Sequence, residues 1–259
     1  MNATAVILAR RGSKGVPGKN MAPIAGRPCL AWTIDAALAA SSVSNVIVST
    51  DSPEAAALAQ RMNATVVDRP DSLAGDDASV DAAARHALEA RGDTMGAVVI
   101  LYANVPVRPH GLIDRAAELL RLSGADSVQS YAPVGKHHPW WTCRVDAASG
   151  RVAPWAGEQL FHGVYRRQSL PPAYIPDGGV MVVSSDALFL RLPGVPAGPH
   201  AFLGRETHRR AIINEEGAVV DIDSPIDVCV ADAVLRAASE RPEEDRGAPH
   251  ALAAPGARA

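Results

Sequence analysis

The densest group of chemically capable residues in this chain follows its first apolar segment. Ala5–Ala9 is short, apolar and β-branched enough to form a buried strand. Three glycines and four cations fall within the next ten residues: Gly12, Gly15, Gly18, Arg10, Arg11, Lys14 and Lys19. Glycine lets a backbone approach a ligand closely, and the cations supply charge where several phosphate oxygens would meet. We therefore expect this loop to bind a nucleoside triphosphate.

Neither of two well-known phosphate motifs fits the loop. The dinucleotide fingerprint needs Gly-x-Gly-x-x-Gly, whereas the glycines here fall at Gly12, Gly15 and Gly18. A P-loop needs four residues between its first glycine and the Gly-Lys pair, followed by Ser or Thr. Here five residues separate Gly12 from Gly18-Lys19, and Asn20 follows. A solvated basic turn would explain the cations but not so many glycines directly after a buried strand, so the triphosphate interpretation is favoured.

A pair of carboxylates near the C-terminal end is the second chemically capable group. Asp221 and Asp223 follow the apolar run Ala218–Val220. Residues two apart on a strand point to the same side, so both carboxylates can bind one cation while Ile222 points into the core. Mg²⁺ commonly takes one or two carboxylates together with substrate phosphates. The alternative is a polar strand end in which Asp223 or Ser224 caps the next helix, but a neighbouring triphosphate loop favours magnesium.

The elements that must position these residues alternate between strands and helices. Strands are predicted near 5–9, 46–49, 65–67 and 97–101, and helices near 29–40, 53–62, 79–90 and 109–122. This alternation predicts an α/β fold with a doubly wound, mainly parallel sheet. Ligands of such sheets bind beyond the carboxyl ends of the strands, so the loops that follow the first, second and fourth strands should converge on one cleft.

The segment from about 131 to 172 breaks this alternation. It is rich in Trp, His, Pro and Arg and contains three of the four tryptophans, so we expect a loop-rich insertion that covers the cleft or contacts a second subunit. The alternation resumes with strands at 179–184 and 219–222 and a helix at 225–238. We therefore expect a single α/β domain over residues 1–238 and a disordered tail at 239–259.

Composition restricts the class of protein. Hydrophobic residues make up 47% of the 259 residues and aromatic residues 4%, so the core must consist mainly of Ala, Val, Leu and Ile. The net charge of −3 argues against nucleic-acid binding driven by counterion release. Cys29, Cys143 and Cys229 are scattered, which favours reduced thiols in a cytoplasmic protein over disulfides or a zinc site. The chain shows no signal-peptide pattern and no apolar run near the roughly 20 residues of a membrane span, so we expect no membrane attachment.

Five motifs in a fixed order make the chain similar to a known family. The first is Leu8-Ala-Arg10-x-x-Ser13-Lys14-Gly15-x-Pro17-x-Lys19-Asn20. The other four are Val48-Ser-Thr-Asp51; Arg69-Pro70 with Leu73-Ala74-x-Asp76-x-Ala78-Ser79; Arg167-Gln168-x-Leu170-Pro171; and Val220-Asp-Ile-Asp-Ser224. Over nearly its whole length the chain resembles the acylneuraminate cytidylyltransferases, which make CMP-sialic acids.

The resemblance implies a reaction, a fold and an assembly. The anomeric hydroxyl of a nine-carbon 2-keto sugar acid would attack the α-phosphate of CTP and release pyrophosphate. The fold would be that of the nucleotide-diphospho-sugar transferases, and the molecule would be a homodimer in which an arm of one subunit helps cover the partner's sugar site.

The candidate site residues, most of which match the family motifs, divide into four groups. Nucleotide binding is assigned to Leu8, Ala9, Arg10, Gly12, Ser13, Lys14, Asn20, Arg69 and Ser79. Catalysis is assigned to Arg10, Lys14 and Lys19, which can hold the triphosphate and the departing pyrophosphate. The metal ligands are Asp221 and Asp223, and the sugar-binding residues are Tyr102, Arg167, Gln168 and Asp177. An arginine such as Arg167 can hold a carboxylate bidentately; a basic surface loop is the alternative for Arg167, and a surface charge is the alternative for Arg69.

Departures from the family pattern cluster at the sugar end. Tyr102 opens Tyr-Ala-Asn-Val-Pro where the family often has Gln-Pro-Thr-Ser-Pro, and Asp177 replaces the asparagine of Pro-Asn-Gly. Trp141 stands where sialic-acid enzymes have a lysine, and Met181 replaces a tyrosine. These changes would refit the sugar pocket, so the sequence predicts a nonulosonic acid as the acceptor and does not assign it to N-acetylneuraminate.

Two other functions remain possible on sequence grounds. A nucleotide-sugar-dependent glycosyltransferase also pairs an α/β nucleotide domain with Asp-x-Asp, but the basic loop suits a free triphosphate better than a diphospho-sugar. A non-catalytic nucleotide-binding module is the third interpretation. The general base is also open, because either a metal-bound hydroxide or an aspartate would serve.

Overall fold

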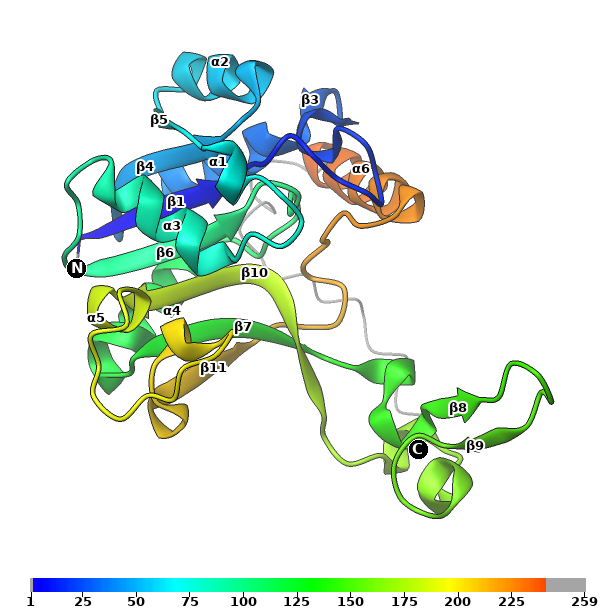
Figure 1. Cartoon of the computed structure of the whole chain (residues 1–259). Coiled ribbons are helices and arrows are strands. Elements are labelled where there is room, and N and C mark those ends of the chain that lie inside the picture. Colours follow the sequence, from blue (N-terminus) through cyan, green and yellow to red (C-terminus); the bar gives the residue numbers. More distant parts are fainter. Residues whose placement is uncertain (1, 241–259) are drawn as a thin grey trace, which may run out of the picture.

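The fold is built on one seven-stranded sheet, and the computed structural model describes residues 2–240. The strands are β1 (Ala3–Leu8), β4 (Val43–Thr50), β5 (Thr65–Asp68), β6 (Ala97–Tyr102), β7 (Ser127–Pro133), β10 (Tyr174–Ser184) and β11 (Arg209–Ile213). They lie in the order β11-β7-β10-β6-β1-β4-β5, and every neighbouring pair is parallel except those of β10 with β6 and β7 (Figure 1). The predicted α/β fold with a mainly parallel sheet is confirmed.

Helices cover both faces of this sheet. They are α1 (Cys29–Ala39), α2 (Pro53–Arg61), α3 (Val80–Glu89), α4 (Leu112–Ser123), α5 (Ser185–Leu188) and α6 (Pro225–Ser239). Along β1, Ala3, Ala5 and Ile7 pack with α1, α2 and α4, whereas Val6 and Leu8 pack with α3 and α5. Because both faces of β1 are covered, its sequence is a continuous apolar run, and that run identified it as a buried strand.

The helices beside the expected site begin where their sequence signals predict. Pro53 is the first residue of α2, and Ser52 caps it. Ser79 caps α3, and Ser224 and Asp227 form a capping box at the start of α6. Helix α6 continues to Ser239, so the expected tail begins later than predicted; residues 241–259 of that tail lie outside the described residues.

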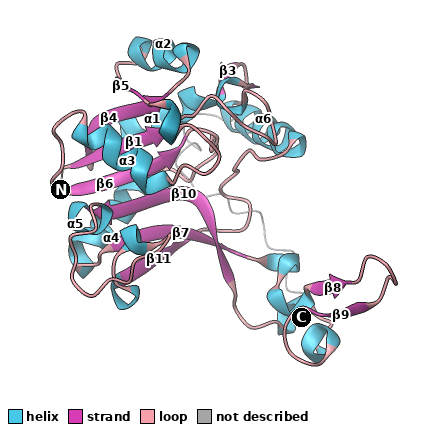
Figure 2. Ribbon diagram, viewed as in Figure 1, coloured by secondary structure: helices cyan, strands magenta, loops and turns pink. Residues whose placement is uncertain are grey.

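Residues 134–173 leave the sheet as an arm. In Figure 1, β7 and β10 extend together beyond the body, and the arm lies at their outer end. It contains the hairpin of β8 (Cys143–Val145) and β9 (Val152–Pro154) and the short turns η3 (Gly135–His137), η4 (Pro139–Trp141), η5 (Leu160–Gly163) and η6 (Arg167–Ser169). Figure 2 shows that loops occupy much more of the arm than of the body.

Smaller elements complete the body. They are the hairpin β2 (Pro23–Ile24) with β3 (Arg27–Pro28) and the turns η1 (Lys19–Met21), η2 (Asp71–Leu73), η7 (Ala201–Leu203) and η8 (Glu206–His208). A small core cluster beneath α6 joins Ile24, Val107, Val220, Ile222 and Ala231. Within the described residues, no helix is both long and apolar enough to cross a membrane.

The strand expected at 219–222 is wrong. Val220 forms one isolated antiparallel bridge with Val107, and no further ladder follows. The next backbone hydrogen bond runs from the N–H of Ile222 to the carbonyl of Asn104 at 2.9 Å, so the segment pairs with a loop instead of a strand. Ile222 is nevertheless fully buried, as its position between the two aspartates predicted.

Candidate active site

Three loops that leave the carboxyl ends of β1, β4 and β6 lie against one another, as the parallel sheet predicts. The hydroxyl of Thr50 donates to the carbonyl of Ala9 at 2.6 Å. The backbone N–H of Arg11 donates to the Asp51 carboxylate at 2.6 Å, and that of Ala103 donates to the carbonyl of the last β1 residue at 3.2 Å. The start of the basic loop is therefore fixed against both neighbouring strands.

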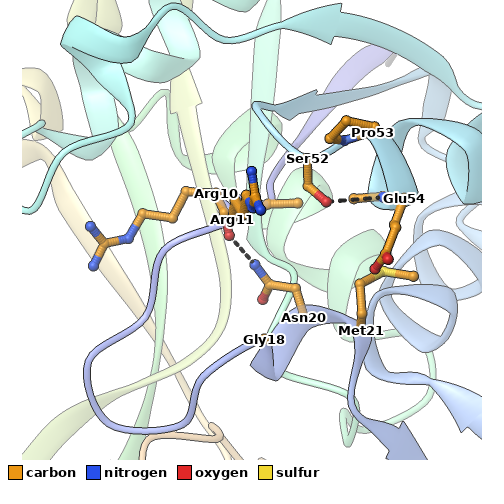
Figure 3. A pocket seen from close by; sticks show the side chains of 10 residues that line it. Arg10, Arg11, Gly18, Asn20, Met21, Ser52, Pro53 and Glu54 are labelled. Atoms are coloured by element: carbon orange, nitrogen blue, oxygen red, sulfur yellow. Dashed lines mark hydrogen bonds between the residues drawn. The ribbon is translucent and has the colours of Figure 1, made fainter.

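A pocket of about 430 Å³ opens beside this loop (Figure 3). Its lining comprises Ala9, Arg10, Arg11, Gly18, Asn20, Met21, Ser52, Pro53, Glu54 and Ala55. Asn20 is 9% exposed, and its amide nitrogen donates to the carbonyl of Arg10 at 2.8 Å. The buried carbonyl oxygen of its side chain has no hydrogen-bond partner among residues 2–240. Because an unpaired buried acceptor is costly, this oxygen suits a donor group on a ligand.

Two of the three loop glycines have a backbone reason to be glycine. Gly18 has a φ of +66°, in the left-handed region that other residues rarely adopt. A Cβ on Gly15 would lie 2.2 Å from the carbonyl oxygen of Asp223. This glycine therefore permits close contact between the basic loop (residues 10–19) and the acidic segment (residues 221–223). Gly12 is exposed, has ordinary φ and would meet no atom within 4 Å.

Two of the predicted catalytic cations share one carboxylate. Arg10 donates to Asp76 at 2.8 Å and to the carbonyl of Gly75 at 3.1 Å, and Lys14 contacts the other Asp76 oxygen at 2.6 Å. Figure 3 shows the Arg10 guanidinium pointing away from the pocket, consistent with this contact. Lys14 and Arg10 lower the pKa of Asp76, because both stabilise its ionised form. Asp76 is therefore the partner of both cations within the chain.

Lys19 links the basic loop to the acidic segment. Its ammonium group donates to the carbonyl of Ile222 at 2.9 Å and to the Asp223 carboxylate at 2.8 Å. The Lys19 side chain is 18% exposed, whereas that of Asp223 is 73% exposed. The cation is thus held in place by a backbone oxygen, while the carboxylate remains open to solvent.

Asp221 lies deeper than Asp223. Burial and the neighbouring Asp223 charge raise its pKa to about 6, against the opposing effects of Lys19 and Arg108. Asn104 donates a hydrogen bond to one Asp221 oxygen. The Asp221 carboxylate is thus partly buried and has a hydrogen-bond donor within the chain.

The chemistry of this acidic pair fits a hard divalent cation. Carboxylate oxygens are ligands that Mg²⁺ prefers, and a cation between Asp221 and Asp223 would relieve the repulsion that raises the Asp221 pKa. No cluster of three or more His, Cys, Asp or Glu residues that could hold a metal occurs within residues 2–240. The remaining ligands of a cation held by these two carboxylates would be backbone, water or substrate oxygens.

Two residues assigned to the nucleotide also have structural roles. Arg69 is 7% exposed and donates to the hydroxyl of Ser49 at 3.1 Å and to its carbonyl at 2.8 Å, so the alternative of a surface charge is wrong. Burial lowers the Arg69 pKa to about 10, against the opposing effect of Asp51. Ser79 accepts from the N–H of Ala82 as the cap of α3.

A second pocket, of about 390 Å³, lies beside the other half of the sheet. Its lining comprises Ser79, Val80, Asp81, Tyr102, Gln129, Tyr131, Pro176, Met181, Pro199, His200, Phe202, Leu203 and Arg209. Of the predicted sugar-binding residues, Tyr102 lines it, and burial raises the pKa of the Tyr102 phenol. Arg209 lines it as well, and its buried Nε has no partner within residues 2–240.

The other predicted sugar-binding residues lie outside this pocket. Asp177 accepts hydrogen bonds from the hydroxyl of Ser130, from the N–H of Gly179 at 2.9 Å and from Asn214 at 2.6 Å. Arg167 pairs with Glu216 at the base of the arm, and Gln168 follows it in the exposed turn η6. The structure therefore does not bring the four predicted sugar-binding residues together within one chain.

Sequence comparison identifies the family. A family model described as Cytidylyltransferase matches residues 4–140, more than half of the chain. The chain belongs to the cytidylyltransferase family. This cytidylyltransferase is therefore a nucleotidyltransferase, as its motifs predicted.

Two curated relatives extend the similarity. The CMP-N,N'-diacetyllegionaminic acid synthase of Legionella pneumophila is 30% identical over 231 residues, which cover 88% of this chain and 93% of that protein. The N-acylneuraminate cytidylyltransferase of Streptococcus agalactiae is 32% identical over 193 residues, which cover 74% of this chain and 45% of the streptococcal protein. The cytidylyltransferase thus spans nearly all of the first relative and less than half of the second.

Two solved structures share the fold. One is a CMP:2-keto-3-deoxy-manno-octonic acid synthetase complexed with CTP, with a TM-score of 0.65, 17% identity, and coverage of 92% of this chain and 99% of that chain. The other is the 4-diphosphocytidyl-2C-methyl-D-erythritol synthase of Anaerococcus prevotii, with a TM-score of 0.58, 12% identity, and coverage of 91% and 99%. At these identities the likeness shows the fold alone.

Several residues that lie at the site of this cytidylyltransferase were not predicted from the sequence. Asn104 and Arg108 follow β6 and contact Asp221 and the surrounding carbonyls, while Gln129 and Arg209 line the second pocket. The position of residues 102–108 after a strand was a signal that they belong to the cleft. Gln129 and Arg209 lie on strands that the sequence did not reveal.

Proposed function

We propose that this cytidylyltransferase transfers CMP from CTP to a nonulosonic, sialic-acid-like 2-keto sugar acid and releases pyrophosphate. The observation that carries the proposal is the contact between the basic loop and the acidic segment, where Lys19 pairs with Asp223 and Gly15 touches its backbone. A triphosphate and a divalent cation need this combination of charges side by side. The acceptor class comes from the relatives, whose names specify legionaminic and acylneuraminic acids.

Charge neutralisation is the first task of the loop. Arg10 and Lys14 would exchange Asp76 for phosphate oxygens, while Lys19 stays anchored on the Ile222 carbonyl and faces the departing pyrophosphate. Leu8, Ala9, Gly12 and Ser13 supply the backbone of the cradle. The free side-chain oxygen of Asn20 would accept from the nucleoside, and Arg69 and Ser79 would fix the surrounding backbone.

The reaction is a displacement at the α-phosphorus. The anomeric oxygen of the acid sugar forms a new bond to that phosphorus, and the bond to the oxygen bridging the α- and β-phosphates breaks. The electron pair leaves with pyrophosphate, and the hydroxyl proton passes to a base. Asp221 and Asp223 would hold Mg²⁺, which supplies neutralisation of phosphate charge.

The second pocket suits the acceptor. Tyr102, Met181 and Phe202 give it apolar walls, and Arg209 offers an unpartnered Nε that suits a carboxylate. Arg167, Gln168 and Asp177 lie outside it, so any contact of Arg167 and Gln168 with a sugar would come from another subunit.

We further propose a cytoplasmic homodimer formed through the arm. The supporting observation is the exposed apolar surface of the arm, which includes Trp155 at 56%, Phe161 at 46% and Tyr165 at 83% exposure. A two-fold contact would place Arg166 or Arg167 near the partner's cleft, and dimers of this symmetry are the commonest oligomers.

The experiment that tests the function is pyrophosphate release with each of the four nucleoside triphosphates and a panel of 2-keto sugar acids. The proposal predicts release with CTP, Mg²⁺ and at least one nonulosonic acid. Release of a nucleoside diphosphate from a nucleotide sugar would instead support a glycosyltransferase. CTP binding without turnover of any acid would support a non-catalytic module.

A further inference from the structure

Asn104 makes three hydrogen bonds to the acidic segment. Its side-chain nitrogen donates to one oxygen of the Asp221 carboxylate and to the carbonyl of Ile222, the latter at 3.2 Å. Its backbone carbonyl accepts from the N–H of Ile222 at 2.9 Å. The loop after β6 and the residues that follow Val220 are therefore joined at this one asparagine.

The loop that carries Asn104 is itself held in place by Arg108. The Arg108 guanidinium donates to the carbonyls of Tyr102 at 2.9 Å and of Val105, which lie on either side of Asn104. It also donates to the Gly179 carbonyl at 2.7 Å and to the Thr33 hydroxyl at 2.9 Å. All three nitrogens of this guanidinium thus donate to neutral acceptors, and these bonds fix the loop geometry around Asn104.

The second oxygen of Asp221 faces a position without a side chain. It lies 3.3 Å from where a Cβ of Gly178 would stand, and Gly178 has a φ of +75°. Glycine at this position places no side chain against the second oxygen, while the first accepts a hydrogen bond from Asn104. The carboxylate therefore presents one oxygen to the protein and leaves one for another ligand.

We propose that Asn104 is a positioning residue that fixes the orientation of the Asp221 carboxylate and thereby sets the affinity of the site for a divalent cation. The inference rests on the proposed function, because it assumes that Asp221 binds the metal. Asn104 acts through Asp221 and is not itself a ligand. An amide suits this role, because it donates to a carboxylate without adding a competing negative charge.

The test uses the full-length protein with CTP and no acceptor, so that no turnover occurs, and measures Mn²⁺ binding by electron paramagnetic resonance. Mn²⁺ shares the oxygen-rich octahedral preference of Mg²⁺. Asn104→Ala keeps the backbone bond to Ile222 but removes the amide, and a hydrogen bond to a charged group is worth enough that Mn²⁺ affinity should fall about tenfold. Asn104→Asp should bind no better than Asn104→Ala, because it replaces the donor with a repelling charge.

Asn214→Ala is the matched control. Asn214 is 6% exposed and donates to Asp177 at 2.6 Å, the same type of bond to a carboxylate that is not a proposed metal ligand. It should lower the melting temperature without changing Mn²⁺ affinity. Unchanged Mn²⁺ affinity in Asn104→Ala would overturn the inference, as would Mn²⁺ binding in Asn104→Asp tighter than wild type, since the side chain at 104 would then be a ligand. If the wild-type protein binds no Mn²⁺ in the presence of CTP, both the inference and the proposed metal site are wrong. If the wild-type protein binds Mn²⁺ and turns over normally while Asn104→Ala binds Mn²⁺ equally well, only the inference is wrong.

Discussion

The basic loop pairs charged side chains within the chain, whereas the arm leaves large apolar side chains exposed to solvent. Three of the four cations of the loop have partners within the chain: Arg10 and Lys14 on Asp76, and Lys19 on Asp223. In and beside the arm, large apolar side chains are left exposed: Val145, Val152, Trp155, Leu160, Phe161, Tyr165, Tyr174 and Ile175.

Aromatic residues of the arm also pack against one another. Trp140 stacks on His162 with ring centroids 4.8 Å apart, and His138 packs edge-on against Trp140. The indole N–H of Trp141 donates to the carbonyl of Val164 at 2.7 Å. The arm is therefore folded but not covered. The charged side chains of the nucleotide side are thus paired within one chain, whereas the arm leaves apolar surface exposed, and this is the surface on which we propose that the dimer forms.

Removing Arg10 should produce the largest effect on the nucleotide side. Arg10→Ala should lower turnover with CTP by at least about a hundredfold, because a preorganised donor to the phosphates is lost. Its melting temperature should stay near that of wild type, since the guanidinium lies at the surface. Arg61→Ala, an exposed arginine at the end of α2, serves as the charge-matched control. Full turnover in Arg10→Ala would contradict a phosphate-binding loop.

The acidic pair should give the next largest effect. Asp221→Asn and Asp223→Asn should each reduce pyrophosphate release by roughly tenfold or more, because each removes a charged ligand of the proposed metal. Raised Mg²⁺ should restore part of the loss if weaker metal binding is the cause. If both variants keep wild-type rates across a Mg²⁺ titration, the carboxylates serve only the local structure.

Charging the arm should break the assembly without damaging the nucleotide side. Phe161→Asp combined with Tyr165→Asp should convert a dimer into a monomer in sedimentation velocity at micromolar concentration. CTP binding should persist, while turnover falls if the arm completes the partner's sugar site. Met95→Asp, on the body and 75% exposed, should stay dimeric. If the wild-type protein is a fully active monomer, the arm has a function other than dimerisation.

Releasing the loop cations should have the smallest effect and the opposite sign. Asp76→Asn removes the carboxylate that competes with phosphate for Arg10 and Lys14, so CTP should bind roughly two- to fivefold more tightly, as expected for partly exposed ion pairs. Asp77→Asn, at the neighbouring exposed position, should leave the affinity for CTP unchanged. Isothermal titration with CTP measures both, and weaker binding in Asp76→Asn would mean that Asp76 orients the cations productively.

The sequence predicted the nucleotide side well because local signals agree there. The apolar run of β1, the glycines after it and the proline and serine that start α2 each act within a few residues. The partners of the loop cations could not be predicted from such local signals, because Asp76 and Asp223 lie 66 and 204 residues from Arg10 and Lys19. Only the folded chain brings them together.

The missed elements depend on distant pairing. Strand β7 has the mixed sequence Ser-Val-Gln-Ser-Tyr-Ala-Pro and is stabilised by β10 and β11 on its two sides. The opposite error occurred at residues 219–222: their sequence predicted a strand, but the backbone N–H groups of Val220 and Ile222 bond to the loop residues Val107 and Asn104. Hydrophobic pattern alone does not specify the partner of an extended segment.

The central claim is tested most directly by identifying the product by ³¹P nuclear magnetic resonance. Wild-type protein would be incubated with CTP, Mg²⁺ and N,N'-diacetyllegionaminic acid or a sialic acid. The proposed cytidylyl transfer predicts that CTP resonances give way to one phosphodiester and inorganic pyrophosphate in equal amounts. Unchanged CTP with every nonulosonic acid tried would contradict it.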